Sequence, residues 1–64
     1  MDRDTRELVA QLATRLGMAF EDAAPVALTL EARDDGERAL AVGSLERTLA
    51  RTNALLDAII VLIR

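Results

Sequence analysis

The fold of this chain depends on the arrangement of residues 26–42, which read VALTLEARDDGERALAV. Apolar residues occupy every second position at the start of this stretch, at Val26, Leu28, Leu30 and Ala32. A two-residue period is typical of a β-strand with one buried face, since on a helix Val26 and Leu30 would point away from Leu28. The stretch therefore predicts a strand.

The segment Asp34-Asp35-Gly36 that follows predicts the turn of a β-hairpin. In a three-residue hairpin loop the third residue takes a left-handed conformation, for which Gly36 is suited. This register places Leu30 opposite Leu40, so that the apolar side chains of the two strands share one face. A loop of two residues would turn the apolar residues of the second strand to the polar face.

An all-helical arrangement is the alternative, a three-helix domain in which residues 22–34 and 37–64 form the later helices. The many Ala and Leu residues of the chain favour it. Against it stands Gly43-Ser44, because a glycine inside a helix costs about 1 kcal/mol relative to alanine. In the hairpin interpretation the same pair ends the second strand, and Ser44 becomes the N-cap of the last helix.

One helix is expected on each side of the hairpin. The first covers about residues 5–16, with Asp4 as its N-cap and Gly17 as its C-cap, and Pro25 would stop any continuation. Its apolar residues recur at helical spacing, at Leu8, Leu12, Leu16 and Phe20. The second covers about residues 45–63. The predicted fold class is α+β, a single domain over residues 1–64 with a hairpin at about 26–42.

The C-terminal helix carries the residues that we expect to form an interface. Its apolar seam follows the spacing of a heptad repeat and consists of Leu45, Leu49, Thr52, Leu56, Ile59 and Ile63. Ile60 and its neighbours make the last turns apolar on nearly every side, and such a helix is normally buried all round. One short helix and one hairpin cannot surround it. We therefore expect a homodimer in which the C-terminal helices pack together.

Thr52 is the polar member of this seam. A polar residue in such a position can fix the register and the choice of partner. Alternatively, its hydroxyl bonds to the backbone of its own helix and has no role in recognition.

The composition excludes most catalytic chemistry. The chain has 64 residues, eight basic and eleven acidic, and it contains neither Cys nor His. Without Cys there is no disulfide or thiolate metal site, and without His the commonest general base and metal ligand is missing. We expect no enzymatic activity, no cofactor and no metal. Because the core of so short a chain is marginal, oligomerisation is the remaining route to stability.

The function expected from these features is that of a small non-catalytic protein-interaction module. It would self-associate through its C-terminal helix and act as an adaptor or a chaperone-like partner-binding protein. The order of a helix ending at Leu16-Gly17, alternating strands and an apolar closing helix is similar to that of small dimeric secretion chaperones, a likeness of layout that no specific residue carries. The alternatives are a small antitoxin-like dimeric regulator linked to nucleic acids, or an accessory subunit of a larger enzyme.

The charges bear on the choice of partner. A net charge of -3 argues against nucleic-acid binding, which needs a basic face. A regulator of that kind would need its arginines to gather on one surface, in the first instance Arg3, Arg6, Arg15 and Arg38. Arg47 and Arg51 lie one helical turn apart and could grip a carboxylate or phosphate, although such pairs more often form a solvated face.

The location expected from the sequence is the cytoplasm. The charged start of the chain, Met1-Asp2-Arg3-Asp4, has no apolar run behind it of the kind that marks a secretory signal. No apolar run reaches the roughly 18 residues of a membrane span.

Overall fold

The computed structural model describes residues 1–64, and its first element, helix α1, spans Arg3–Leu28. Asp2 is the N-cap, because its side chain accepts a hydrogen bond of 2.7 Å from the backbone N–H of Thr5. The helix passes through Gly17 without interruption, with no positive φ angle at any glycine. The predicted N-cap at Asp4 and the predicted end of the helix at Leu16 are therefore wrong.

Pro25 lies inside α1, so the expectation that it would stop the helix is also wrong. A proline removes one helical hydrogen bond, which here falls in the last turns. That bond would run to the carbonyl of Glu21, four residues earlier. Thr29 forms the C-cap, and its backbone N–H and its hydroxyl both donate to the carbonyl of Pro25, at 3.1 and 2.7 Å. The last residue of α1 is therefore Leu28, directly before the Thr29 cap.

Helix α2 spans Asp35–Ile63 and begins where the hairpin turn was expected. Asp34 is its N-cap, accepting a hydrogen bond of 2.8 Å from the backbone N–H of Glu37. Gly43 and Ser44 lie in the interior of this helix, so Ser44 is not an N-cap. In a helix of 29 residues the cost of one internal glycine is small beside the hydrogen bonds that a break would remove.

The structure contains two helices and no strand, so the predicted α+β fold is wrong. The all-helical alternative has the correct class, but the chain forms two helices and not three. Val26 and Leu30 are half-buried whereas Leu28 is 84% exposed. The apolar alternation therefore distinguishes residues that lie near α2 from one that faces solvent. It does not indicate a strand. The likeness to secretion chaperones, which rested on strands, is lost with them.

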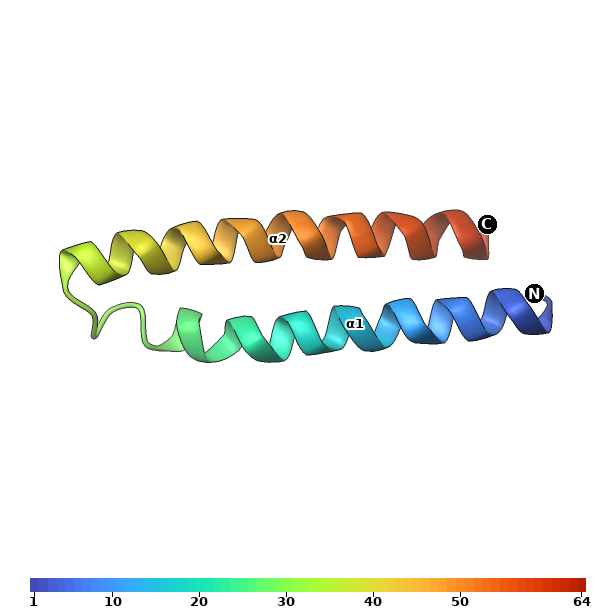
Figure 1. Cartoon of the computed structure of the whole chain (residues 1–64), viewed down its shortest axis with the longest axis horizontal. Coiled ribbons are helices and arrows are strands. Elements are labelled where there is room, and N and C mark those ends of the chain that lie inside the picture. Colours follow the sequence, from blue (N-terminus) through green and yellow to red (C-terminus); the bar gives the residue numbers. More distant parts are fainter.

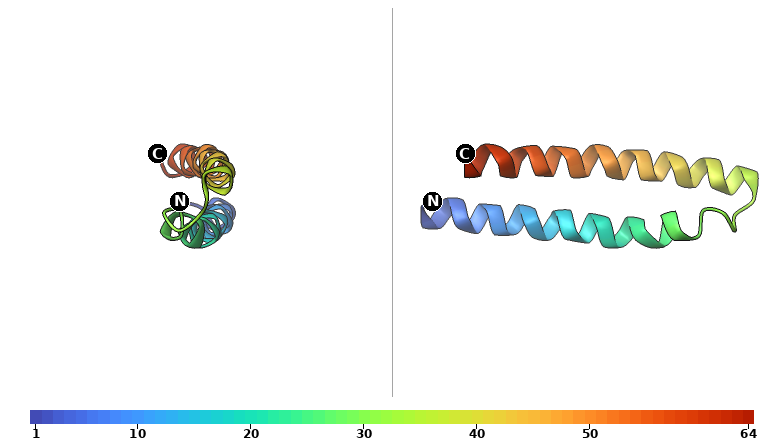
Figure 2. Two further views of the ribbon diagram at one scale, coloured as in Figure 1. Left: turned by 90° about the vertical axis from the view of Figure 1, so that its left-hand side faces the viewer. Right: turned by 180° about the vertical axis from the view of Figure 1, so that it is seen from behind.

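The two helices lie side by side and antiparallel, joined by residues 29–34, so that both ends of the chain are at the same end of the molecule (Figure 1). Viewed from the end, they form a single layer two helices wide (Figure 2). The molecule measures 49 × 15 × 11 Å. Each helix therefore has one neighbour within the chain, and much of its circumference is left open.

The connection between the helices is held by Arg38, in the first turns of α2. Its guanidinium donates to the carbonyl of Arg33 at 2.6 Å and to those of Leu30 and Glu31 at 3.3 Å. It also forms an ion pair of 2.7 Å with Asp35. The carbonyl of Leu30 also accepts from the backbone N–H of Arg33 at 3.3 Å, whereas for those of Glu31 and Arg33 the loop backbone supplies no donor.

The surface between the helices is a narrow seam with the spacing of an antiparallel coiled coil. The residues that α1 contributes are Val9, Leu12, Leu16, Ala19, Ala23 and Val26, and those of α2 are Ala41, Leu45, Thr48, Thr52, Leu55, Ile59 and Leu62. Only Ala19, Ala41 and Thr52 are fully buried, and the rest are half-buried. A single hairpin therefore leaves most of its apolar side chains partly in water.

Candidate functional site

The structure divides the predicted interface residues of α2 into two groups. Leu45, Thr52 and Ile59 belong to the seam against α1. Leu49, which is 61% exposed, faces solvent. Leu56 and Ile63 share its side of the helix, one and two heptads further on, and are also exposed, while Ile60 is half-buried beside them.

The predicted seam thus merges two neighbouring stripes of α2. The contact with α1 also uses Thr48, Leu55 and Leu62, which the sequence analysis did not include. A seam that continues from Leu45 to Thr48 also alternates steps of three and four residues, just like the predicted seam that continues to Leu49. Spacing alone therefore fits both stripes, and the expected contact between copies through Leu49, Leu56 and Ile63 stays a prediction.

Thr52 is buried in the seam, with 4% of its surface exposed. Its hydroxyl donates a hydrogen bond of 2.9 Å to the carbonyl of Leu49 in its own helix. The hydroxyl is therefore satisfied within α2 and is not available to a partner.

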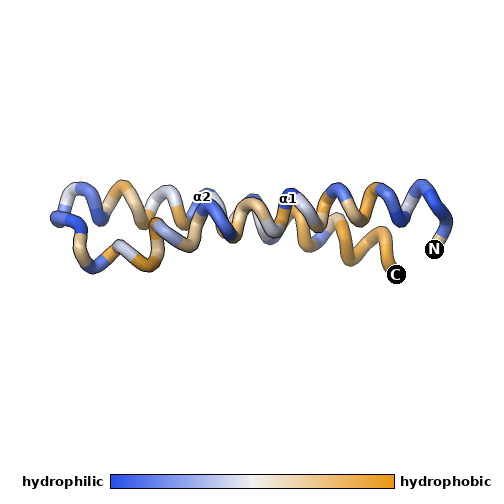
Figure 3. The backbone as a smooth tube through the Cα atoms, turned by 90° about the horizontal axis from the view of Figure 1, so that it is seen from below, coloured by the Kyte–Doolittle hydropathy of each residue, from blue (hydrophilic) through white to orange (hydrophobic).

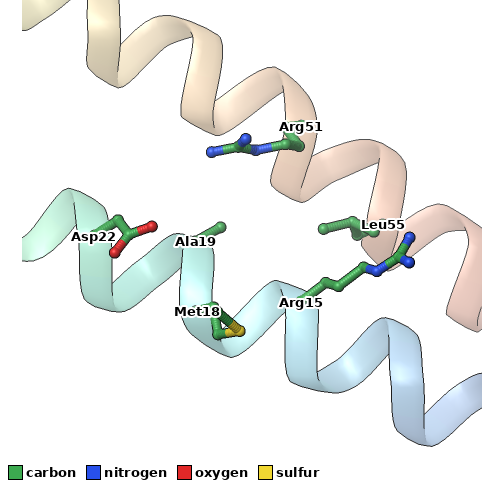
Figure 4. Close-up of a pocket in the computed structure, with 6 residues that line it drawn as sticks. All are labelled: Arg15, Met18, Ala19, Asp22, Arg51 and Leu55. Carbon is green, nitrogen blue, oxygen red and sulfur yellow. The ribbon is translucent and has the colours of Figure 1, made fainter.

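The seam divides the surface of the hairpin into two flanks. An open hollow lined by both helices shows which side of α1 lies on the same flank as which side of α2. Arg15 and Asp22 of α1 and Arg51 of α2 line this hollow together (Figure 4). These three residues directly precede the seam residues Leu16, Ala23 and Thr52. Residues that directly follow seam residues must consequently lie on the opposite flank of both helices.

The opposite flank is apolar over most of its length. We define the outer face as the surface formed there by Ala13, Gly17, Phe20 and Ala24 of α1 and by Val42, Leu49, Leu56, Ile60 and Ile63 of α2. Phe20, the one aromatic residue, is more than half exposed. A Cβ atom placed on Gly17 would meet nothing within 4 Å, so no group of the chain explains the glycine. Glu46 and Asn53, which directly follow the seam residues Leu45 and Thr52, are the polar residues on the α2 side between Val42 and Ile63.

The apolar end of α2 is only partly covered within the chain, since Ile59 and Leu62 are half-buried in the seam while Val61 and Ile63 stay exposed. Figure 3 shows that the C-terminal turns of α2 are hydrophobic, whereas the first turns of α1 beside them are strongly hydrophilic. Arg3 and Glu7 of α1 pair with each other at 3.4 Å and remain exposed. The charged start of α1 therefore cannot bury Ile60 and Ile63.

The surface area gives a measure of what the chain leaves uncovered. A chain of 6.9 kDa exposes 4933 Å² here, which is about 900 Å² more than the roughly 4,000 Å² expected of a compact monomer of that mass. A typical interface covers about 800 Å² on each partner. The excess exposed area is therefore similar to the area that one partner buries in a typical interface.

The other flank is polar around Arg51. A second hollow adjoins the first and is lined by Ser44, Arg47, Thr48 and Arg51, with no apolar residue among them. We call these four residues the arginine groove. Neither Arg15, Arg47 nor Arg51 forms an ion pair or a hydrogen bond within the chain.

The acidic residues at the helix starts have a structural explanation. Hydrogen bonds from the Thr5 backbone and hydroxyl lower the pKa of the Asp2 carboxyl, and those from Glu37 and then Gly36 lower the pKa of Asp34. Both carboxyls act as helix caps. No three acidic side chains come together in a way that could hold a metal ion.

Neither helix has a stretch that combines the length and the apolar character needed to cross a membrane. Comparison with known protein families, characterised proteins and solved structures finds no match to this chain. The outer face and the arginine groove are therefore the surfaces from which a function can be argued.

Proposed function

We propose that the protein is a non-catalytic interaction module whose first partner is a second copy of itself, bound through the outer face. Two hairpins joined in this way form a four-helix bundle. The observation that carries the proposal is the uncovered apolar stripe of Leu49, Leu56 and Ile63, which continues the heptad spacing on a side of α2 that α1 does not reach.

A second copy suits this surface for two reasons. Symmetric dimers bring the same patch of both subunits together, so the patch must complement itself. The outer face offers large side chains on α2 and mostly small ones on α1, and surfaces of this kind can interdigitate. The excess area of about 900 Å² also agrees with the roughly 800 Å² that each partner of a stable complex covers.

Leu49→Asp tests the proposal. Leu49 is 61% exposed in the single chain, so covering both of its copies contributes about 2–4 kcal/mol to the dimer. We expect the variant to raise the dimer dissociation constant by at least about 30-fold, and up to about 1,000-fold. Sedimentation equilibrium at micromolar concentrations measures this constant.

Leu40→Asp is the matched control. Leu40 is 77% exposed and lies one turn before Ser44, on the side of the arginine groove. We expect it to leave the dissociation constant within about threefold of the original, a difference of about 0.7 kcal/mol. Equal weakening by both variants, or a Leu49→Asp protein that dimerises normally, would contradict the outer face as the interface.

A nucleic-acid-linked regulator is the second candidate. The arginines first considered for that role do not gather, since Arg3 pairs with Glu7 and Arg38 is engaged with the loop carbonyls. The observation that favours this candidate is a different set, Arg15, Arg47 and Arg51, on the flank opposite the outer face. Retardation of a duplex in a gel at about 50 mM salt, where phosphate contacts are strongest, tests it.

A further inference from the structure

We propose that the arginine groove is a binding site for a phosphate group. Ser44, Arg47, Thr48 and Arg51 follow one another at spacings of three, one and three residues, which places all four on one side of α2. They line a hollow of about 260 Å³ that contains no acidic and no apolar side chain. A surface built only of guanidinium and hydroxyl groups complements an oxyanion, because every polar side chain there can donate.

The hydroxyl groups support this proposal independently of the charges. The hydroxyls of Thr14, Thr29 and Thr52 each donate to a backbone carbonyl of their own helix. Those of Ser44 and Thr48 make no such bond, although both residues are half-buried. Two donors are therefore free beside two unpaired guanidinium groups.

Arg15 of the facing helix lies on the same flank, but its side chain turns away from Arg51 and does not line this hollow. Figure 4 shows Arg51 reaching from α2 toward Asp22, while Arg15 reaches from α1 toward Leu55. Asp22 lies more than 4 Å from Arg51, since the two form no ion pair. Asp22 competes with an anion for Arg51 but leaves Arg47 free, so the two arginines of the hollow still outnumber the one carboxylate beside it, in a chain whose net charge is -3.

The position of Arg47 is compatible with this role. One terminal nitrogen of its guanidinium lies 3.6 Å from where a Cβ of Gly43 would be, so the side chain folds back along α2 over Gly43. The site lies on the flank opposite the outer face, so its success or failure is separate from that of the dimer.

The test follows arginine side-chain N–H signals by NMR during titration with inorganic phosphate at low salt. We expect saturable shifts at Arg47 and Arg51. Arg47→Gln with Arg51→Gln should weaken binding at least about tenfold. The control, Arg3→Gln with Arg64→Gln, removes the same charge far from the groove and should change affinity by less than about twofold.

A charge-neutral variant separates the groove from general electrostatics. Ser44→Ala with Thr48→Val should weaken phosphate binding about threefold or more, since it removes two donors and no charge. A parallel titration with a nucleic-acid duplex distinguishes a phosphate borne on a polymer from a free one. Binding of either that is weakened by the groove variants and not by the control supports the site. Absence of saturable shifts with both, or equal weakening by the arginine pair and its control, would overturn the proposal.

Discussion

Arg38→Ala tests the account of how the two helices are joined. The guanidinium donates to three loop carbonyls, of Leu30, Glu31 and Arg33, at 3.3, 3.3 and 2.6 Å. Each such bond contributes about 0.5–1.5 kcal/mol, and the two longer ones belong at the low end. The ion pair with Asp35 adds little, because that carboxylate is fully exposed. We expect the variant to lower the free energy of unfolding by about 2 kcal/mol.

The assay is urea unfolding followed by helical circular dichroism at one fixed chain concentration, because the proposed dimerisation would make stability depend on concentration. Arg38→Lys keeps the charge, but an ammonium cannot fork over three carbonyls, so about half the loss should remain. Arg3→Ala, which removes an exposed ion pair, should stay within about 0.5 kcal/mol of the original protein. An Arg38→Ala protein as stable as the Arg3→Ala control would refute the role given to this side chain.

Two further predictions concern the helix ends. Pro25→Ala should raise the free energy of unfolding by about 1–3 kcal/mol in the same urea assay, because it restores a helical N–H at a position that tolerates alanine; a loss of stability would show that α1 needs the proline to end at Leu28. The carboxyls of Asp2 and Asp34 have lowered pKa values, so the stability they contribute is present above their usual pKa of 3.8 and is lost as the pH falls through the lowered values. Circular dichroism during acid titration should show helix loss in that range. Asp34→Asn, which caps without titrating, should reduce the part of that loss due to α2, and an unchanged acid profile would contradict this assignment.

Leu28 illustrates why the strand was predicted and is absent. On a helix, Val26 and Leu30 point away from Leu28, as expected. A strand was predicted because its two-residue period would keep these apolar side chains together on one face. Leu28 is 84% exposed, and a single exposed apolar residue is common on protein surfaces.

Asp34 shows that part of the correct fold was accessible from the sequence. Asp34 and Glu37 have the same spacing as Asp4 and Glu7, which was used to place the start of the first helix. The same pattern marks the start of α2, and it competes with the turn indicated by Gly36. Local sequence is compatible with both here, because aspartate is favoured at an N-cap and Asp-Gly is favoured in a hairpin turn.

The apolar C-terminal helix was predictable from the sequence, but which of its sides packs against α1 was not. The apolar C-terminal helix was expected and is present within α2. Which of its sides meets α1 depends on the facing helix, whose seam residues Ala19 and Ala23 are small and allow close approach. Leu49 and Leu56 are left over by that choice, which becomes visible only when both helices are placed.

The central claim is that the outer face meets a second copy of the chain, and intermolecular NOEs measure this most directly. In a sample that mixes isotope-labelled and unlabelled chains, a filtered NOE experiment reports only contacts between copies. The account predicts such contacts at the methyl groups of Leu49, Leu56 and Ile63, with none at Leu40 or Val61. A spectrum without intermolecular contacts, or with contacts confined to Leu40 and Val61, would contradict it.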